Sequence, residues 1–316
     1  MAKTLYIVIP CYNEELVIDE TIKRITEKLD KLIKNNMISK KSKMLFVNDG
    51  SKDNTLLKLN EYHEKNKYVN YISLSRNCGH QKALLAGLLT SKKYADITIS
   101  MDADLQDDID AIDKFIEENN KGSDIVYGVR NSRKSDSFFK RNTALLFYKL
   151  MKLIGVEIIN NHADYRLMSK RALDELEKFK EVNLFLRGII PLLGFKTSIV
   201  EYERHKRYAG KSKYSLKKMV SFAFDGLFSF SVMPIRFITS IGFTLSMVSL
   251  LYLLYCVISY FVKGVPIQGW TTIVVLITIF GSFQIFCIGI IGEYIGKIYM
   301  ETKERPRYII EKEMIK

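Results

Sequence analysis

The chain has 316 residues, of which 47% are hydrophobic, and it carries a formal net charge of +13. That length allows one large domain or two smaller ones, and the positive charge suits nucleic acid, an anionic membrane surface or a phosphorylated substrate. Four cysteines without a C-x-x-C pair argue against a disulfide framework, and no nucleic-acid-binding motif is present, so we expect no nucleic-acid partner.

The first 130 residues alternate apolar runs with stretches of helical periodicity. The runs predict strands at residues 5–10, 43–47, 69–74, 124–129 and from residue 97, with helices at residues 14–32, up to residue 65 and at 81–89. Strands that alternate with helices favour a mostly parallel sheet with right-handed crossovers, so the predicted fold class is α/β and Rossmann-like. The first residues show no signal-peptide pattern, and we expect this part to be cytosolic.

Polar side chains follow nearly every predicted strand. They are Asn13, Asp49, Asn77, Asp102, Asp104 and Arg130. Open α/β sheets bind ligands beyond the carboxyl ends of their strands, so this edge is expected to form a nucleotide pocket. Loops are polar in general, but that alone does not explain a carboxylate or amide at nearly all strand ends.

The run from residue 97 ends in Asp102, Asp104 and Gln106. Two carboxylates and an amide oxygen form a ligand set for a hard cation such as Mg²⁺ or Mn²⁺, which usually also bridges to substrate phosphates. The alternative is an acidic helix start, because further acids follow directly in the sequence and acids favour the positive end of a helix.

The last third of the chain contains two long uncharged runs, at residues 237–262 and 270–292. Each is long enough to span a bilayer. Lysine and arginine gather before the first run and after the second, whereas the connection between them has only Lys263. By the positive-inside rule, we expect a two-helix membrane protein with its catalytic part and both termini in the cytoplasm.

Two further segments have membrane-surface character. Residues 138–156 interleave apolar and basic side chains, a pattern that fits either an interfacial helix or a core-facing one. Residues 215–232 are expected to lie along the membrane face before Pro234 turns the chain inward. The predicted organisation is therefore a catalytic domain at residues 1–214, a juxtamembrane segment at 215–235, a transmembrane hairpin at 236–296 and a cytoplasmic tail at 297–316.

Three motifs together resemble the GT-A glycosyltransferases of family 2. They are residues 10–15 (Pro-Cys-Tyr-Asn-Glu-Glu), 47–53 (Val-Asn-Asp-Gly-Ser-Lys-Asp) and 101–106 (Met-Asp-Ala-Asp-Leu-Gln). With two carboxy-terminal membrane helices, the chain is most similar to the polyprenyl-phosphate glycosyltransferases, which include bactoprenol glucosyltransferases and dolichyl-phosphate mannose synthases. The resemblance covers essentially the whole chain.

The resemblance implies a role for each matching position. It assigns Pro10, Tyr12, Asn13, Glu14, Asp49 and Asp102 to the nucleotide, Asp102, Asp104 and Gln106 to Mg²⁺ or Mn²⁺, Asp164 to the acceptor side, and Arg130, Arg141, Arg204, Arg207 and Lys213 to phosphate and acceptor binding. Asp104 and Asp164 are the implied catalytic residues. Asp164 either orients or deprotonates the acceptor, or it simply pairs with Arg166.

The implied reaction is inverting transfer of one sugar from a nucleotide-sugar, UDP-glucose or UDP-N-acetylglucosamine, to polyprenyl (undecaprenyl) phosphate. The resemblance also implies a homo-oligomer, since the relatives tend towards tetramers. Two alternatives remain. A processive polysaccharide synthase is disfavoured by the lack of a Q-x-x-R-W motif, and a non-catalytic membrane scaffold by the intact acidic motif.

Overall fold

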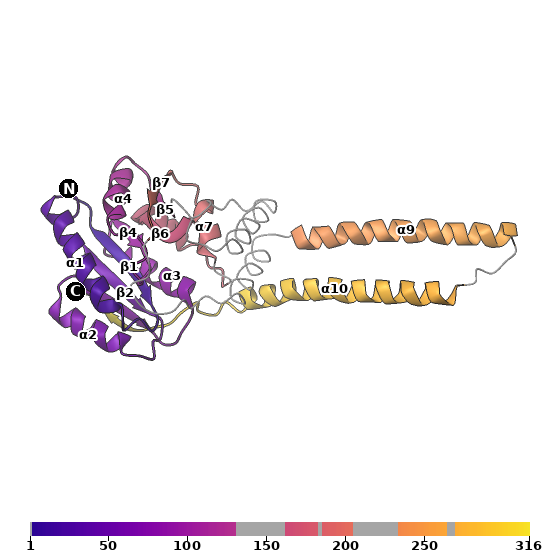
Figure 1. Cartoon of the computed structure of the whole chain (residues 1–316), viewed down its shortest axis with the longest axis horizontal. Coiled ribbons are helices and arrows are strands. Elements are labelled where there is room, and N and C mark those ends of the chain that lie inside the picture. The colour runs from indigo at the N-terminus through magenta and orange to yellow at the C-terminus, as the bar shows by residue number, and fades with distance from the viewer. Residues whose placement is uncertain (1, 131–161, 183–184, 205–232, 264–268) are drawn as a thin grey trace.

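The computed structural model describes residues 2–130, 162–182, 185–204, 233–263 and 269–316. Within these ranges, an α/β domain is followed by two long helices that run side by side away from it (Figure 1). The chain then returns to the domain, where its last strand joins the sheet. In the sequence, the two helices therefore lie between parts of the chain that belong to the domain.

The domain is built on one eight-stranded sheet with the order β7-β5-β6-β4-β1-β2-β3-β8. The strands are β1 (Leu5–Cys11), β2 (Lys43–Asn48), β3 (Val69–Leu74), β4 (Ile97–Ser100), β5 (Ile125–Arg130), β6 (His162–Ser169), β7 (Thr197–Tyr202) and β8 (Ile310–Met314). Strands β6 and β8 run antiparallel to their neighbours, and the other pairings are parallel. The predicted α/β class with a mostly parallel sheet is confirmed.

Helices cover both faces of the sheet because its central strands are apolar on both sides. The helices of the domain are α1 (Ile18–Lys34), α2 (Thr55–Lys65), α3 (His80–Ser91), α4 (Ala111–Asn120), α6 (Lys170–Leu176) and α7 (Leu186–Leu192). Strand β1 shows the division: Leu5 and Ile7 pack with α1, α2 and α4, while Tyr6 and Val8 pack with α3, α6 and α7. This sandwich fixes the strand ends that carry the site.

The first helix begins later than the sequence predicts, at Ile18 instead of residue 14. The backbone N–H groups of Asn13, Glu14 and Glu15 donate to side chains of the loop before α2 and of its first residue, Thr55, at 3.0, 2.9 and 3.2 Å. Because these donors are satisfied by another loop, the chain stays in a turn here and enters the helix afterwards. The motif at residues 10–15 is thereby held open at the edge of the sheet.

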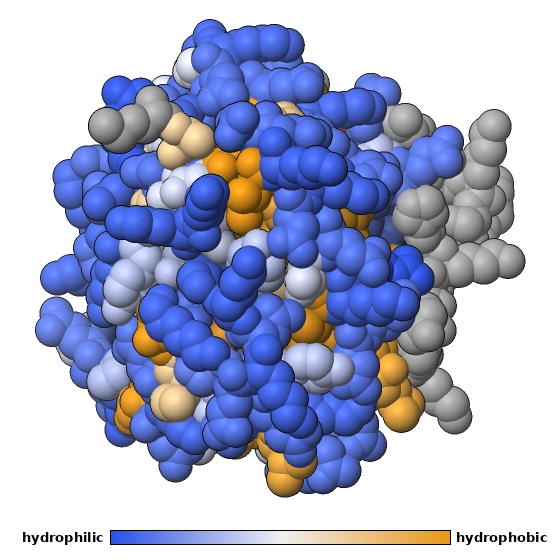
Figure 2. Space-filling view, turned by 90° about the vertical axis from the view of Figure 1, so that its left-hand side faces the viewer, coloured by the Kyte–Doolittle hydropathy of each residue, from blue (hydrophilic) through white to orange (hydrophobic). Residues whose placement is uncertain are grey.

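Helices α9 (Met233–Lys263) and α10 (Trp270–Thr302) contain the two predicted membrane runs. Their apolar windows, Ile235–Tyr252 and Ile279–Thr302, are long and apolar enough to cross a membrane, and none of the residues described there is buried. The opposite end of the molecule is different, because the face of the domain turned away from the helices is covered mainly by hydrophilic residues (Figure 2).

The segment after α10 ties the helices to the domain. The Glu301 carboxylate accepts from the Val182 backbone N–H at 2.9 and 3.0 Å, and Arg307 Nη1 donates to the Phe179 carbonyl at 2.6 Å. Strand β8 then pairs with β3. The segment predicted as a tail, residues 297–316, therefore includes an edge strand of the sheet. Residues 138–156 and 215–232 lie outside the described residues.

Candidate active site

The loops after β1, β2 and β3 are joined by direct contacts. Asn13 adopts a positive φ of 52°, and its side-chain oxygen accepts from the Lys52 backbone N–H at 2.8 Å. Gly50 has a φ of 64°, and a Cβ added there would lie 2.6 Å from the Asn77 backbone nitrogen. Only glycine fits this close approach. The sequence Asp-Gly-Ser after β2 thus allows the three loops to meet.

Asp49 holds the loop after β3 through both carboxylate oxygens. Oδ1 accepts from the Cys78 N–H at 2.6 Å and Oδ2 from the Gly79 N–H at 3.0 Å. Burial raises the pKa of this carboxyl, although the two backbone donors oppose the shift. Asp49 is only 3% exposed. In this structure it organises the loop, and a direct contact with a nucleotide base stays a prediction.

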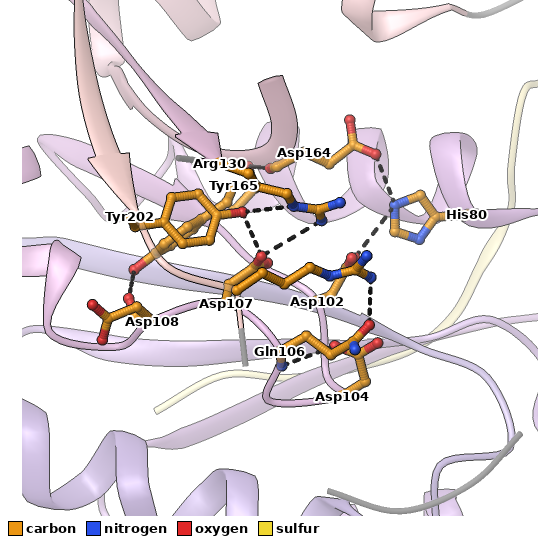
Figure 3. A network of polar contacts seen from close by, with 12 residues as sticks. His80, Asp102, Asp104, Gln106, Asp107, Asp108, Arg130, Asp164, Tyr165 and Tyr202 are labelled. Carbon is orange, nitrogen blue, oxygen red and sulfur yellow. Dashed lines mark hydrogen bonds and ion pairs between the residues drawn. The ribbon is translucent and has the colours of Figure 1, made fainter. Parts of the chain in front are cut away.

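The loop after β4 brings acidic side chains together at the centre of this edge (Figure 3). Leu105 takes a positive φ of 56°, and the Gln106 backbone N–H donates to Asp104 Oδ1 at 3.2 Å. This tight turn places Asp102, Asp104 and Asp107 near one another at the end of the strand. Asp104 and Asp107 are buried, whereas Asp102 is partly exposed.

These carboxylates destabilise one another's charged forms. The pKa of Asp102 is raised by burial and further by the charges of Asp104 and Asp164, while His80 opposes the shift. The pKa of Asp107 rises to about 6, because burial and the nearby Asp102 outweigh the hydrogen bond from Tyr202. Carboxylates that repel one another in this way favour a cation between them.

On one side of the acidic loop, His80 joins Asp102 to Asp164. His80 Nε2 lies 3.7 Å from Asp102 Oδ1 and 3.4 Å from Asp164 Oδ2. Burial works to lower the pKa of His80, but Asp164 and Asp102 outweigh it, so the net shift is upward. Asp164 also pairs with Arg166, as the alternative interpretation expected, and with Arg187. Although burial works to raise the pKa of Asp164, Arg187, His80 and Arg166 hold it well below its usual range.

On the other side, the ends of β5 and β7 contribute cations. Arg130 and Tyr202 are register partners, and Arg130 Nε donates to the Tyr202 hydroxyl at 3.2 Å. That hydroxyl donates to Asp107 Oδ1 at 2.6 Å, and Arg130 Nη2 lies 3.7 Å from the same oxygen. Arg204 follows β7, and its Nη2 donates to Gln106 Oε1. Cations from two strand ends therefore flank the acidic loop.

The structure gathers most of the predicted site residues at one edge of the sheet. The residues in or around the loop after β4 are Asp102, Asp104, Gln106, Arg130, Asp164 and Arg204. The residues on or beside the neighbouring loops after β1 and β2 are Pro10, Tyr12, Asn13, Glu14 and Asp49. Arg141, Arg207 and Lys213 lie outside the described residues. Sequence reasoning missed Arg187 and Tyr202, and it gave His80 no role beyond the loop. An isolated arginine or tyrosine carries no signal of its own.

The acidic loop fits a divalent cation only in part. Among the residues that the structure describes, no group of three or more His, Cys, Asp or Glu side chains is arranged to hold a metal ion. Asp104 and Asp102 supply carboxylate oxygens, whereas Gln106 Oε1 already accepts from Arg204. Mg²⁺ and Mn²⁺ complete such partial shells with substrate phosphate oxygens and water. The donor set is therefore compatible with an ion that arrives with a phosphorylated substrate.

The chain is similar to known proteins in sequence and, more distantly, in structure. Residues 6–177 match the family model described as glycosyl transferase family 2. An uncharacterized glycosyltransferase of Bacillus subtilis (strain 168), YkoT, is 52% identical over 307 residues, which cover 97% of this chain and 91% of that protein. The bactoprenol glucosyl transferase of Shigella phage SfX is 39% identical over 306 residues, covering 96% of this chain and 98% of that protein. Among solved structures, mannosyl-3-phosphoglycerate synthase from Rubrobacter xylanophilus matches 71% of each chain with 14% identity and a TM-score of 0.47.

Proposed function

The chain belongs to glycosyl transferase family 2, and from this membership we propose that it transfers a single sugar from a nucleotide-sugar to polyprenyl phosphate at the cytoplasmic face of a membrane. The resemblance found in the sequence is confirmed at the level of the family. The identities of the acceptor and the donor, and the side of the membrane on which the domain lies, are part of this proposal.

The observation that carries the proposal is the edge of the sheet where acids and cations meet. Asp102 and Asp104 share this edge with three cationic side chains: His80 lies 3.7 Å from Asp102, Arg130 lies 3.7 Å from Asp107, and Arg204 donates to Gln106. A nucleotide-sugar has a diphosphate that needs charge neutralisation, and its leaving group gains negative charge during transfer. Acids for a cation and arginines for phosphates in one place suit this chemistry.

The lipid acceptor is supported by the relatives and by the helices. The bactoprenol glucosyl transferases match at 38–39% identity over nearly the full length of both proteins, so the match includes the two helices. Helices α9 and α10 are long and apolar enough to span a membrane. A lipid phosphate held in the bilayer would reach a domain that is anchored beside it.

For the donor, we propose UDP-glucose first and UDP-N-acetylglucosamine second. The names of the bactoprenol glucosyl transferases favour glucose. The loops after β1 and β2, with Tyr12, Glu14 and Asp49, would surround the base and ribose. They are held together by the contacts of Asn13, Gly50 and Ser51.

The chemistry requires little proton transfer. A phosphate monoester has a second pKa of about 6, so at neutral pH the acceptor is already a nucleophile. Its oxygen forms a bond to the anomeric carbon, the bond from that carbon to the diphosphate breaks, and the electron pair leaves with UDP, which inverts the configuration. Arg130 and Arg204 would hold phosphate oxygens during this exchange, with Arg141, Arg207 and Lys213 as further proposed contacts.

Asp104 and Asp102 would hold the divalent cation, with Gln106 as a third ligand if Arg204 releases it. When bound, Mg²⁺ or Mn²⁺ neutralises charge on the leaving diphosphate.

The lysines and arginines that flank both helices favour cytoplasmic termini, by the positive-inside rule. We further propose that the chain is a homo-oligomer.

The test is transfer of radiolabelled sugar by the purified full chain in detergent. UDP- and GDP-sugars are offered with undecaprenyl phosphate, in Mg²⁺, Mn²⁺ or EDTA, and an Asp104→Ala variant is run in parallel. We expect an acid-labile, solvent-extractable lipid product that depends on the ion and on Asp104. No product with any donor from folded protein would overturn the proposal and favour the scaffold alternative.

A further inference from the structure

The carboxylate of Asp164 is fully engaged with cations. Its Oδ1 lies 2.5 Å from Arg166 Nη2 and 3.2 Å from Arg187 Nε, and its Oδ2 lies 3.0 Å from Arg187 Nη2 and 3.4 Å from His80 Nε2. Its side chain is 8% exposed. A general base needs a free oxygen within reach of the proton that it accepts. Asp164 presents no such oxygen to a substrate.

The two arginines beside Asp164 differ in exposure. Arg166 on β6 is fully buried, and its Nε and Nη1 have no hydrogen-bond partner among the described residues. Arg187 on α7 is 31% exposed and pairs with Asp164 through two nitrogens. Two guanidinium groups thus share one carboxylate, and of these two groups only Arg187 reaches the surface.

This exposed cation lies beside the reaction centre. Asp164 is held against the end of β4, since Ser100 Oγ donates to the Asp164 carbonyl at 2.5 Å. Asp102 follows two residues later, and His80 bridges from it to Asp164. Arg187 is thus separated from Asp102 by only two side chains, those of Asp164 and His80; Figure 3 shows how these two lie beside Asp102.

We propose that Arg187 binds a phosphate group of a substrate, and that Asp164 is a positioning residue that holds Arg187 and His80 in place. This inference rests on the proposed transfer reaction. A guanidinium that is oriented by a carboxylate presents its planar fork in a fixed direction, which suits the oxygens of a phosphate. The phosphate belongs either to the donor's diphosphate or to the acceptor's monophosphate, and the two sources are separable by kinetics.

The first experiment compares Arg187→Gln and Arg187→Lys with the unchanged full chain. An Arg171→Gln variant is the control, because Arg171 is 68% exposed and pairs with Asp124 away from the site. We expect Arg187→Gln to raise one KM at least tenfold or to lower kcat about 100-fold, with partial recovery in Arg187→Lys. A higher KM for the UDP-sugar assigns the donor diphosphate, and a higher KM for the lipid assigns the acceptor. Wild-type kcat and KM values in Arg187→Gln would overturn the inference.

The second experiment asks whether Asp164 acts through Arg187. If it does, the loss of kcat/KM in the double variant Asp164→Asn with Arg187→Gln will equal that of the more damaged single variant. If Asp164 acts independently as a base, the two losses will multiply, which would overturn the positioning role. Melting temperatures of all variants are recorded, because Asp164→Asn weakens a buried ion pair.

A third measurement separates this inference from the proposed function. The affinities of inorganic phosphate and inorganic diphosphate are measured by calorimetry on the unchanged chain and on Arg187→Gln. We expect at least one anion to bind about tenfold more weakly to the variant. If the unchanged chain transfers no sugar, the proposed function fails while this comparison still decides the inference. Equal affinities for both anions would overturn it.

Discussion

The catalytic domain and the two long helices place similar apolar side chains in opposite surroundings. In the domain, Leu5, Ile7 and Ile9 are fully buried between helices, and the face turned away from α9 and α10 is mainly hydrophilic (Figure 2). Along the helices, Leu251 and Phe261 are 69% and 81% exposed. Soluble proteins rarely leave apolar surface of this extent uncovered. The domain supplies its own core, whereas the helices need an apolar environment from outside.

The polar groups of the two regions differ as well. The domain buries charges such as Asp164 and Arg166, and each is held by an ion pair. The two apolar windows of α9 and α10 contain few charges by comparison. Burying a charge is costly unless it is paired, so such networks usually have a function. The comparison therefore favours the domain for the chemistry and α9 and α10 for the proposed membrane anchorage.

The largest effect is expected from removing an acid at the centre of the site. We predict that Asp104→Ala lowers kcat/KM for sugar transfer about 1000-fold, or about 4 kcal/mol, because the leaving diphosphate would lose the proposed cation. Membrane association and melting temperature are expected to stay near those of the unchanged chain. Asp174→Ala is the control, since Asp174 pairs with Lys92 on the surface. Equal activity of the two variants would remove the chemistry from this edge of the sheet.

A charge in the middle of α9 tests the other half of the comparison. Leu251→Arg is expected to disfavour membrane insertion by about 3 kcal/mol, since arginine is costly at the centre of a bilayer. The matched variant is Leu57→Arg, because Leu57 on α2 is 59% exposed on the domain. It is expected to leave insertion unchanged. The measurement is the fraction of protein that stays in carbonate-washed membranes, and an equal fraction for both variants would contradict a spanning α9.

A glycine in each region gives a smaller effect. A Cβ at Gly87 would lie 2.4 Å from Val8 Cγ1 and 2.6 Å from Val47 Cγ2, both in the core, whereas a Cβ at Gly289 would meet no atom of the described residues within 4 Å. We expect Gly87→Ala to lower the free energy of unfolding of the domain by about 1–3 kcal/mol. Gly289→Ala is expected to leave it unchanged. Thermal melts in detergent measure both. A melt of Gly87→Ala like that of the unchanged chain would contradict the packing described here.

The sequence was sufficient for the strands that look apolar throughout. Strands β1, β2, β3 and β5 were predicted because continuous apolar runs end in polar residues. Strand β6 was not, since it places the charged Asp164 and Arg166 in the middle of the sheet. Strand β8 is an exposed edge strand with the sequence Ile-Glu-Lys-Glu-Met, which has no apolar run and no alternation.

The sequence predicted residues of the candidate site only where charged side chains stand at the end of a predicted strand. Asp102 and Asp104 follow β4, and Arg130 is the last residue of β5, so the topology alone brings them together. His80 and Arg187 reach the same place from the starts of two helices that are far apart in the sequence. Their contact with Asp164 depends on how those helices pack, and no local pattern records that.

The smallest effect is expected at the connection between the two regions. Glu301→Ala removes the acceptor of the Val182 N–H, and we expect a local loss of about 1 kcal/mol. Amide hydrogen exchange near Val182 should accelerate several-fold, while the melting temperature stays within a few degrees. Glu311→Ala, at an exposed position on β8, is the control. If the rate of amide hydrogen exchange at Val182 does not change, the hydrogen bonds between Val182 and Glu301 do not restrain the segment around Val182.

The measurement that tests the central claim most directly compares acceptors for the same full chain in lipid vesicles. Radiolabelled UDP-glucose is supplied from outside with Mn²⁺ or Mg²⁺, and the vesicles contain undecaprenyl phosphate, a neutral polyprenol or neither. We predict that labelled lipid forms only with undecaprenyl phosphate and disappears with EDTA. Labelled lipid from the neutral polyprenol, or none from any acceptor while UDP still binds, would contradict the claim that the domain transfers sugar to a membrane-held phosphate.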